Sequence, residues 1–176
     1  MSEFGSHRAR KRFGQNFLVD QKYVEKIVDA LDLTREDTVV EIGAGRGAVT
    51  EILVEKAAKL FAIELDRDLI PVLRERFGSL PNFKLVDADA LSIDFSNFGA
   101  HETKPKLVAN LPYNISTAIL QRLIEHRWIF SEMVLMFQRE VVERITAPVG
   151  TKERGFLTLL VEAAFGTERL FDVPGA

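Results

Sequence analysis

The sequence has no cysteine among its 176 residues, which excludes disulfide bonds, zinc–thiolate sites, iron–sulfur clusters and thiol nucleophiles. It has no apolar run approaching the roughly 18 residues that a membrane-spanning helix needs, and no signal peptide opens the chain. Its three histidines lack the spacing of metal ligands. These absences favour a cytoplasmic protein with no membrane association and no metal.

The composition is that of an ordinary globular protein, with 47% hydrophobic and 28% charged residues. A chain of this length is large enough to bury most of its unfolded surface around one core. We therefore expect one compact domain.

The net charge of −3 is distributed unevenly along the chain. Residues 1–13 carry a balance of +3, and the other residues carry −6. The basic residues of this arm are Arg8, Arg10, Lys11 and Arg12. A basic arm on an acidic body favours a polyanion partner such as RNA. A solvated tail is the alternative, and residues 1–7 resemble the remnant of a cloning tag.

Hydrophobic periodicity predicts strands that alternate with helices. Strands are predicted over residues 38–42, 59–65, 83–86, 106–109 and 132–137, and a sixth over 167–173. Helices are predicted after Asp20, from the glycine turn to about residue 56, after Asp66, and over residues 116–126, 139–145 and 156–165. This alternation is typical of an α/β fold with a mostly parallel sheet covered by helices on both faces. Ligands of such sheets bind at the carboxyl ends of the strands.

A glycine-rich turn, residues 43–47, joins the first predicted strand to a helix. Glycines permit positive φ and let a ligand lie against bare backbone, and the helix start presents free N–H groups. The spacing of Gly43, Gly45 and Ala48 also fits a loose dinucleotide fingerprint. A nicotinamide or flavin enzyme, and a purely structural turn, therefore remain alternatives.

Acidic residues follow the next two strands. Glu64 ends the second strand, where a carboxylate can accept both hydroxyls of a ribose. Asp89 follows the third strand, where it could accept from an adenine amino group, and Asp87 competes for that role. The glycine turn and two acids describe a nucleoside pocket better than a pyrophosphate pocket, which suits a methionyl-adenosine ligand.

The tetrapeptide Asn110-Leu111-Pro112-Tyr113 follows the fourth strand. The Asn110 side-chain oxygen and the Leu111 carbonyl could accept hydrogen bonds from an adenine amine and so make it a better nucleophile. Pro112 fixes φ, and Tyr113 could stack on an extruded base. A plain turn is the alternative.

These residues together resemble the small-subunit rRNA adenine N6,N6-dimethyltransferases, the KsgA family. The resemblance covers nearly all of residues 8–174. It is carried by residues 10–18, 41–47, 64–66, 87–90, 110–114 and 137–141. It implies a Rossmann-like, S-adenosylmethionine-dependent methyltransferase fold that dimethylates adenines of small-subunit rRNA during ribosome assembly, with S-adenosylhomocysteine as product and a monomeric state.

The resemblance also implies roles for individual residues. Those implied to bind S-adenosylmethionine are Gln15, Asn16, Leu18, Gly43, Gly45, Glu64, Leu65, Asp89, Ala90 and Asn110. Those implied to hold the target adenine are Asn110, Leu111, Pro112 and Tyr113. From chemistry alone, residues 13–18 are only a packed entry to the first helix.

Members of this family continue past a Val-Pro segment like residues 173–174 into a target-base loop, a final strand and a helical domain. The expected organisation is therefore a basic arm and cofactor loop over residues 1–19 and a C-terminally truncated methyltransferase domain over residues 20–176. Such a fragment is expected to bind the cofactor and to methylate rRNA weakly or not at all. The alternatives are an RNA-binding assembly factor that acts by occupancy and a large-subunit rRNA adenine methyltransferase.

Overall fold

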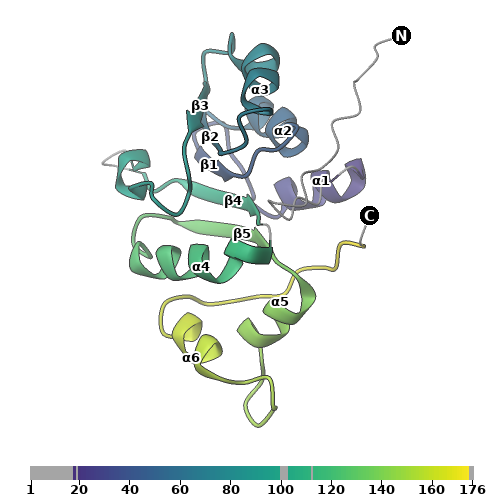
Figure 1. The fold of residues 1–176 in the computed structure, drawn as a ribbon, viewed down its shortest axis with the longest axis vertical. Coiled ribbons are helices and arrows are strands. Elements are labelled where there is room, and N and C mark those ends of the chain that lie inside the picture. Colours follow the sequence, from purple (N-terminus) through teal and green to yellow (C-terminus); the bar gives the residue numbers. More distant parts are fainter. Residues whose placement is uncertain (1–17, 19, 100–102, 112, 175–176) are drawn as a thin grey trace.

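The computed structural model describes residue 18 and residues 20–99, 103–111 and 113–174. Its centre is a parallel sheet of five strands in the order β3-β2-β1-β4-β5 (Figure 1). The strands are β1 (Thr38–Ile42), β2 (Lys59–Glu64), β3 (Phe83–Asp87), β4 (Lys106–Asn110) and β5 (Glu132–Met136). The helices are α1 (Gln21–Asp29), α2 (Ala48–Lys56), α3 (Ile70–Phe77), α4 (Ser116–Glu125), α5 (Arg139–Ile145) and α6 (Phe156–Glu162), with short 3-10 helices η2 (Phe95–Phe98) and η3 (Tyr113–Ile115). The predicted parallel α/β fold is confirmed.

Local signals in the sequence determine where the first helices begin. The Asp20 side chain accepts a hydrogen bond from the Lys22 N–H at 3.0 Å, which caps α1 as predicted. Gly47 precedes α2 with a φ of 84°, a left-handed conformation that favours glycine. The chain therefore leaves the glycine turn and enters α2 without a side-chain cap.

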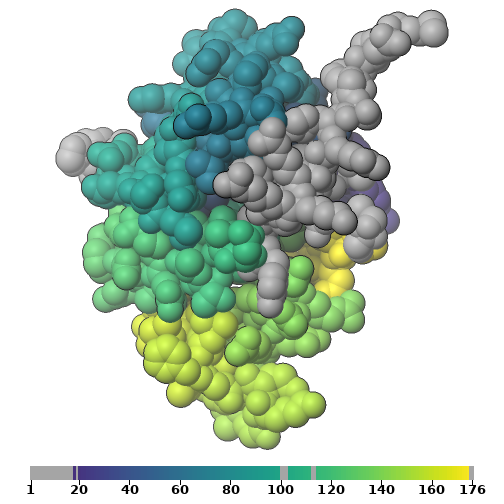
Figure 2. Space-filling model, viewed as in Figure 1, coloured from purple at the N-terminus to yellow at the C-terminus, as the bar shows by residue number. Residues whose placement is uncertain are grey.

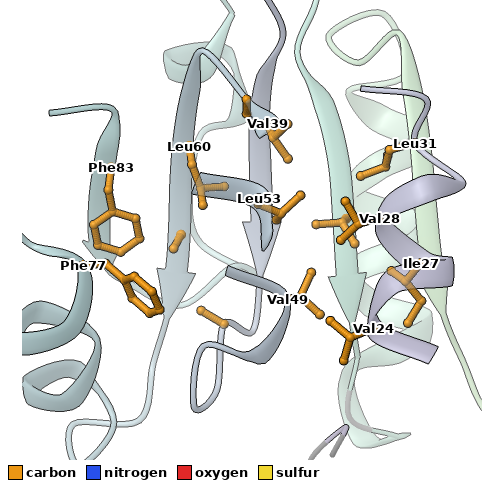
Figure 3. Packing of buried hydrophobic residues seen from close by; sticks show 14 of the residues in the cluster. Val24, Ile27, Val28, Leu31, Val39, Val49, Leu53, Leu60, Phe77 and Phe83 are labelled. Carbon is orange, nitrogen blue, oxygen red and sulfur yellow. The ribbon is translucent and has the colours of Figure 1, made fainter. Parts of the chain in front are cut away.

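Two hydrophobic layers hold the helices on the sheet. Successive strand residues point to opposite faces, so Val39 belongs to one layer and Val40 to the other. Figure 3 shows the first layer, in which Val28 of α1 and Leu53 of α2 pack over the strands. The second layer includes Phe95 and Phe98 of η2 and Ile119 and Leu123 of α4.

A third, smaller cluster joins α4, α5 and α6 through Leu120, Val141, Ile145 and Val161. Of these helices, α5 and α6 belong to the light-green and yellow lobe at the lower end of Figure 2. None of the helices in the described part of the chain is long and apolar enough to cross a membrane.

Two predictions about elements are wrong. Residues 167–173 form no strand, because Phe171 packs on α1 instead of pairing with the sheet: its ring lies 6.4 Å from the Tyr23 ring, and the Lys26 ammonium lies 5.5 Å above it. Asp66 does not cap α3 directly. Its side chain accepts from the Asp68 N–H at 3.0 Å in a turn that precedes the helix. Pro71, which has no N–H to donate, stands in the first turn, so α3 begins only at Ile70.

Candidate functional site

A cavity of about 1190 Å³ lies at the carboxyl ends of β1, β2, β4 and β5. It is larger than the roughly 300–1,000 Å³ of a typical small-molecule site, because residues 165–174 extend its wall. The predicted site residues that line it are Leu18, Gly43, Gly45, Glu64, Leu65, Asp89, Ala90, Asn110 and Leu111. The direction of the strand order changes between the neighbouring strands β1 and β4, and ligands of open α/β sheets bind at such a point.

The glycine turn forms the wall of this cavity beyond β1. Gly43 has a φ of 77°, and a Cβ atom added to it would lie 3.2 Å from the Asn110 carbonyl oxygen of β4. A Cβ atom on Gly47 would lie 2.5 Å from Cε2 of Phe77. Gly43 therefore allows the close approach of β1 and β4, and Gly47 allows α3 to pack against the turn.

Glu64 is buried at the end of β2, where three backbone N–H groups hold its carboxyl group. Gly45 donates to Oε2 at 2.8 Å, and Leu65 and Asp66 donate to Oε1 at 2.9 and 2.8 Å. These bonds fix the carboxyl group against the glycine turn. A carboxylate has about four acceptor positions, so it can still accept from a ligand hydroxyl.

The structure distinguishes Asp87, the last residue of β3, from Asp89, which follows the strand. Asp89 lines the cavity, whereas Asp87 does not. Oδ1 of Asp89 accepts from the Leu91 N–H at 2.9 Å, which orients the side chain. Ala90 is buried and Leu65 is 46% exposed, and both apolar side chains line the cavity.

Asn110 and Leu111 stand at the end of β4. Asn110 is paired in register with Met136 of β5, and the Leu111 N–H donates to the Met136 carbonyl at 3.3 Å. Leu111 is buried in the second hydrophobic layer. The sheet therefore fixes the backbone of Asn110 and Leu111 beside the cavity that both residues line.

A family model described as "Ribosomal RNA adenine dimethylase" matches residues 6–176. The chain belongs to this family.

Two relatives named "Ribosomal RNA small subunit methyltransferase A" support the membership of the adenine dimethylase family. The one from Pseudomonas savastanoi is 46% identical over the whole chain. The one from Clostridium botulinum is 46% identical over 90% of the chain. The chain spans 66% and 58% of the length of these relatives.

Solved structures give the same fold. A dimethyladenosine transferase from Plasmodium falciparum is 33% identical with a TM-score of 0.74, over 83% of this chain and 52% of that one. The 23S rRNA methyltransferase ErmE is 29% identical with a TM-score of 0.63, over 77% of this chain and 53% of that one. The Rossmann-like methyltransferase fold is thereby confirmed, and the nicotinamide oxidoreductase alternative is not favoured.

Several predicted site residues of this adenine dimethylase family member lie outside the described residues. They are Arg8, Arg10, Lys11, Arg12, Gln15, Asn16, Pro112 and the side chain of Tyr113. Among the described residues, no group of three or more His, Asp or Glu side chains is arranged to hold a metal ion.

Sequence reasoning assigned no role to Glu41, a buried acid that lines the cavity. The Thr50 hydroxyl donates to its Oε2 at 2.7 Å. Burial raises the pKa of Glu41 to about 7, the negative charge of Glu64 adds to this rise, and the Thr50 hydrogen bond opposes it. The signal was present in the sequence, because Glu41 is an acid within an otherwise apolar strand.

The second missed feature is the wall formed by residues 165–174. Arg139 at the start of α5 lies 3.5 Å from Asp172, which ties this wall to the end of β5. Phe171 of this wall packs against the first hydrophobic layer, a contact between distant parts of the chain that no local pattern in the sequence encodes.

Proposed function

We propose that this chain is the cofactor-binding and catalytic part of an enzyme that uses S-adenosylmethionine to dimethylate N6 of adenines in small-subunit rRNA. The observation that carries the proposal is the single cavity in which Gly43, Glu64, Asp89 and Asn110 meet, in a chain of the adenine dimethylase family. Because the chain spans 66% of the first relatives' length, the activity of the whole protein is part of this proposal.

The residues of the cavity fit the chemical groups of this cofactor. Gly43 and Gly45 leave backbone open to the methionine part, Glu64 accepts from the ribose hydroxyls, and Asp89 accepts from the adenine amino group. Leu65 and Ala90 flank the adenine ring. Residues 1–19, including Gln15 and Asn16, form an arm and loop that complete this side of the pocket, and residues 20–176 form the methyltransferase domain.

When bound, the cofactor supplies a sulfonium methyl group that is already activated for transfer. The Asn110 side-chain oxygen and the Leu111 carbonyl accept hydrogen bonds from the target amine, which directs its lone pair toward the methyl group. Pro112 holds this backbone, and Tyr113 stacks on the extruded base. The proton then leaves to water.

The proposed partner is small-subunit rRNA within an immature subunit, bound by a monomer in the cytoplasm. The basic arm, Arg8, Arg10, Lys11 and Arg12, supplies phosphate contacts. The curated relatives act on the small subunit by name, which favours that substrate over large-subunit rRNA.

The test is transfer of a radiolabelled methyl group to small subunits that lack the modification. This chain is compared with a version extended by the C-terminal third of the Pseudomonas savastanoi relative, and with large subunits as the control substrate. We expect cofactor binding by both versions and strong small-subunit methylation by the extended one. Methylation of large subunits alone, or no cofactor binding, would contradict the proposal.

A further inference from the structure

Glu41 lies in the cavity but has no role in the proposed function. It is only 3% exposed and is the last residue but one of β1, between Ala62 of β2 and Val108 of β4 in the sheet register. Because strand side chains alternate, it shares the face of Val39, which α1 and α2 cover. The Thr50 hydroxyl of α2, 2.7 Å away, agrees with this placement.

The carboxyl group of Glu41 is bound on one side and borders the cavity on the other. Its polar partner is Thr50 of α2, whose hydroxyl donates to Oε2 at 2.7 Å and whose backbone also contributes a hydrogen bond. Glu41 is nevertheless one of the residues that line the cavity. A buried acid therefore borders the space in which a ligand would lie.

No cation in the described chain neutralises Glu41. The charged group that acts on it is Glu64, which repels it, and α1 covers this face with Val24, Ile27 and Val28. The other charged residues that line the cavity are Asp20, Arg46, Glu51, Asp66, Arg76, Asp89, Arg139, Glu168, Arg169 and Asp172. A buried carboxylate without a cationic partner is costly, and burial therefore favours the protonated form of Glu41 until a positive charge arrives.

We propose that Glu41 is the counter-charge for the cationic part of the bound cofactor and that it gives up a proton when the cofactor binds. This rests on the proposed function, because S-adenosylmethionine brings a sulfonium and an ammonium group into the cavity. A cation near a carboxyl group favours the ionised form, so occupancy and ionisation are coupled. A neutral nucleoside has no such effect.

Calorimetry of S-adenosylmethionine binding in phosphate and in imidazole buffer, near pH 6.5, tests the coupling. The difference in heat between the buffers gives the number of protons released. Since the pKa of Glu41 is about 7, we expect the wild type to release more than about half a proton per cofactor. Glu41→Gln keeps an acceptor for Thr50, and we expect it to release less than about a fifth of a proton.

A second variant and a second ligand distinguish proton release coupled to binding from a change of fold. Thr50→Val removes a bond that favours the ionised form, so near pH 8 it is expected to release more protons than the wild type. The neutral ligand 5′-methylthioadenosine is expected to release none from the wild type. Equal heats in both buffers, or equal release from wild type and Glu41→Gln, would overturn the inference, whereas absence of any cofactor binding would overturn the proposed function itself.

Discussion

The backbone N–H of Gly45 donates a hydrogen bond of 2.8 Å to the carboxyl group of Glu64. This bond joins the glycine turn after β1 to the end of β2. The same carboxyl group also orders the backbone of Leu65 and Asp66. One buried side chain therefore shapes two walls of the cavity before any ligand is bound.

Glu64→Ala is expected to weaken S-adenosylmethionine binding by at least about tenfold, because a hydrogen bond to a charged group contributes about 1.5–3 kcal/mol. It also leaves backbone donors without an acceptor and is expected to lower the free energy of unfolding by about 2–3 kcal/mol. Calorimetry and urea unfolding measure the two effects. Glu55→Ala, at an exposed position of α2, is the control and should change neither; unchanged affinity in Glu64→Ala would contradict the ribose role.

Gly43→Ala is expected to be more harmful than Gly150→Ala, although both glycines have a positive φ of 77° and 89°. At Gly150 a Cβ atom meets nothing within 4 Å, so only backbone strain of about 1 kcal/mol is expected. At Gly43 it lies 3.2 Å from the Asn110 carbonyl oxygen, so a loss of about 2–3 kcal/mol is expected together with weaker cofactor binding. Equal losses of stability and affinity in the two variants would contradict this account of Gly43.

The order of elements was predictable because its signals are local. Asp20 and the glycines of residues 43–47 mark helix starts within a few residues, and short apolar runs mark the strands. The gathering of Glu64, Asp89 and Asn110 was predictable as well, since carboxyl ends of parallel strands share one edge of the sheet.

The remaining features depend on contacts between distant parts of the chain. Residues 167–173 have a strand-like composition, but Phe171 packs against Tyr23 in α1, and no local pattern encodes that pairing. The alternation of side chains along β1 predicts on which face of the sheet Glu41 lies. Its burial depends instead on how closely α1 and α2 cover that face. Such tertiary effects override local preferences.

The stability of the wild type relative to Glu41→Gln is expected to fall as the pH rises from about 4.5 through about 7. Over this range the unfolded chain loses the Glu41 proton while the folded protein, in which the pKa is raised to about 7, retains it. The folded state therefore binds more protons, and its advantage is lost with rising pH, by up to about 3 kcal/mol. Urea unfolding of both proteins at several pH values measures the difference; a constant difference would contradict the raised pKa.

Lys106→Met is expected to lower the free energy of unfolding by about 1–3 kcal/mol. The Lys106 ammonium on β4 donates to the carbonyls of Leu31 and Asp32 after α1, at 2.7 and 2.8 Å, and lies 3.5 Å from Asp37. Burial raises the pKa of Asp37, but hydrogen bonds from Thr34 and the charge of Lys106 hold it below its ordinary value. In Lys106→Met the pKa of Asp37 should therefore rise, as NMR titration can measure.

The control for Lys106→Met is Lys104→Met, at an exposed position just before β4. It removes the same charge and should leave both stability and the Asp37 pKa nearly unchanged. A similar loss in both variants would show that net charge, and not the bond to the end of α1, explains the effect.

Asn110→Ala is expected to separate binding from catalysis. Glu64 and Asp89 keep their places at other strand ends, so affinity for S-adenosylmethionine should stay within about threefold of the wild type. Loss of the side-chain acceptor for the target amine should reduce methyl transfer by at least about a hundredfold. The two quantities are measured by calorimetry and by radiolabelled transfer, in this chain and in the version extended with the relative's C-terminal third.

Asn97→Ala, at an exposed position in η2, is the control for Asn110→Ala. Loss of affinity with transfer preserved at saturating cofactor would assign Asn110 to the cofactor rather than to the target base.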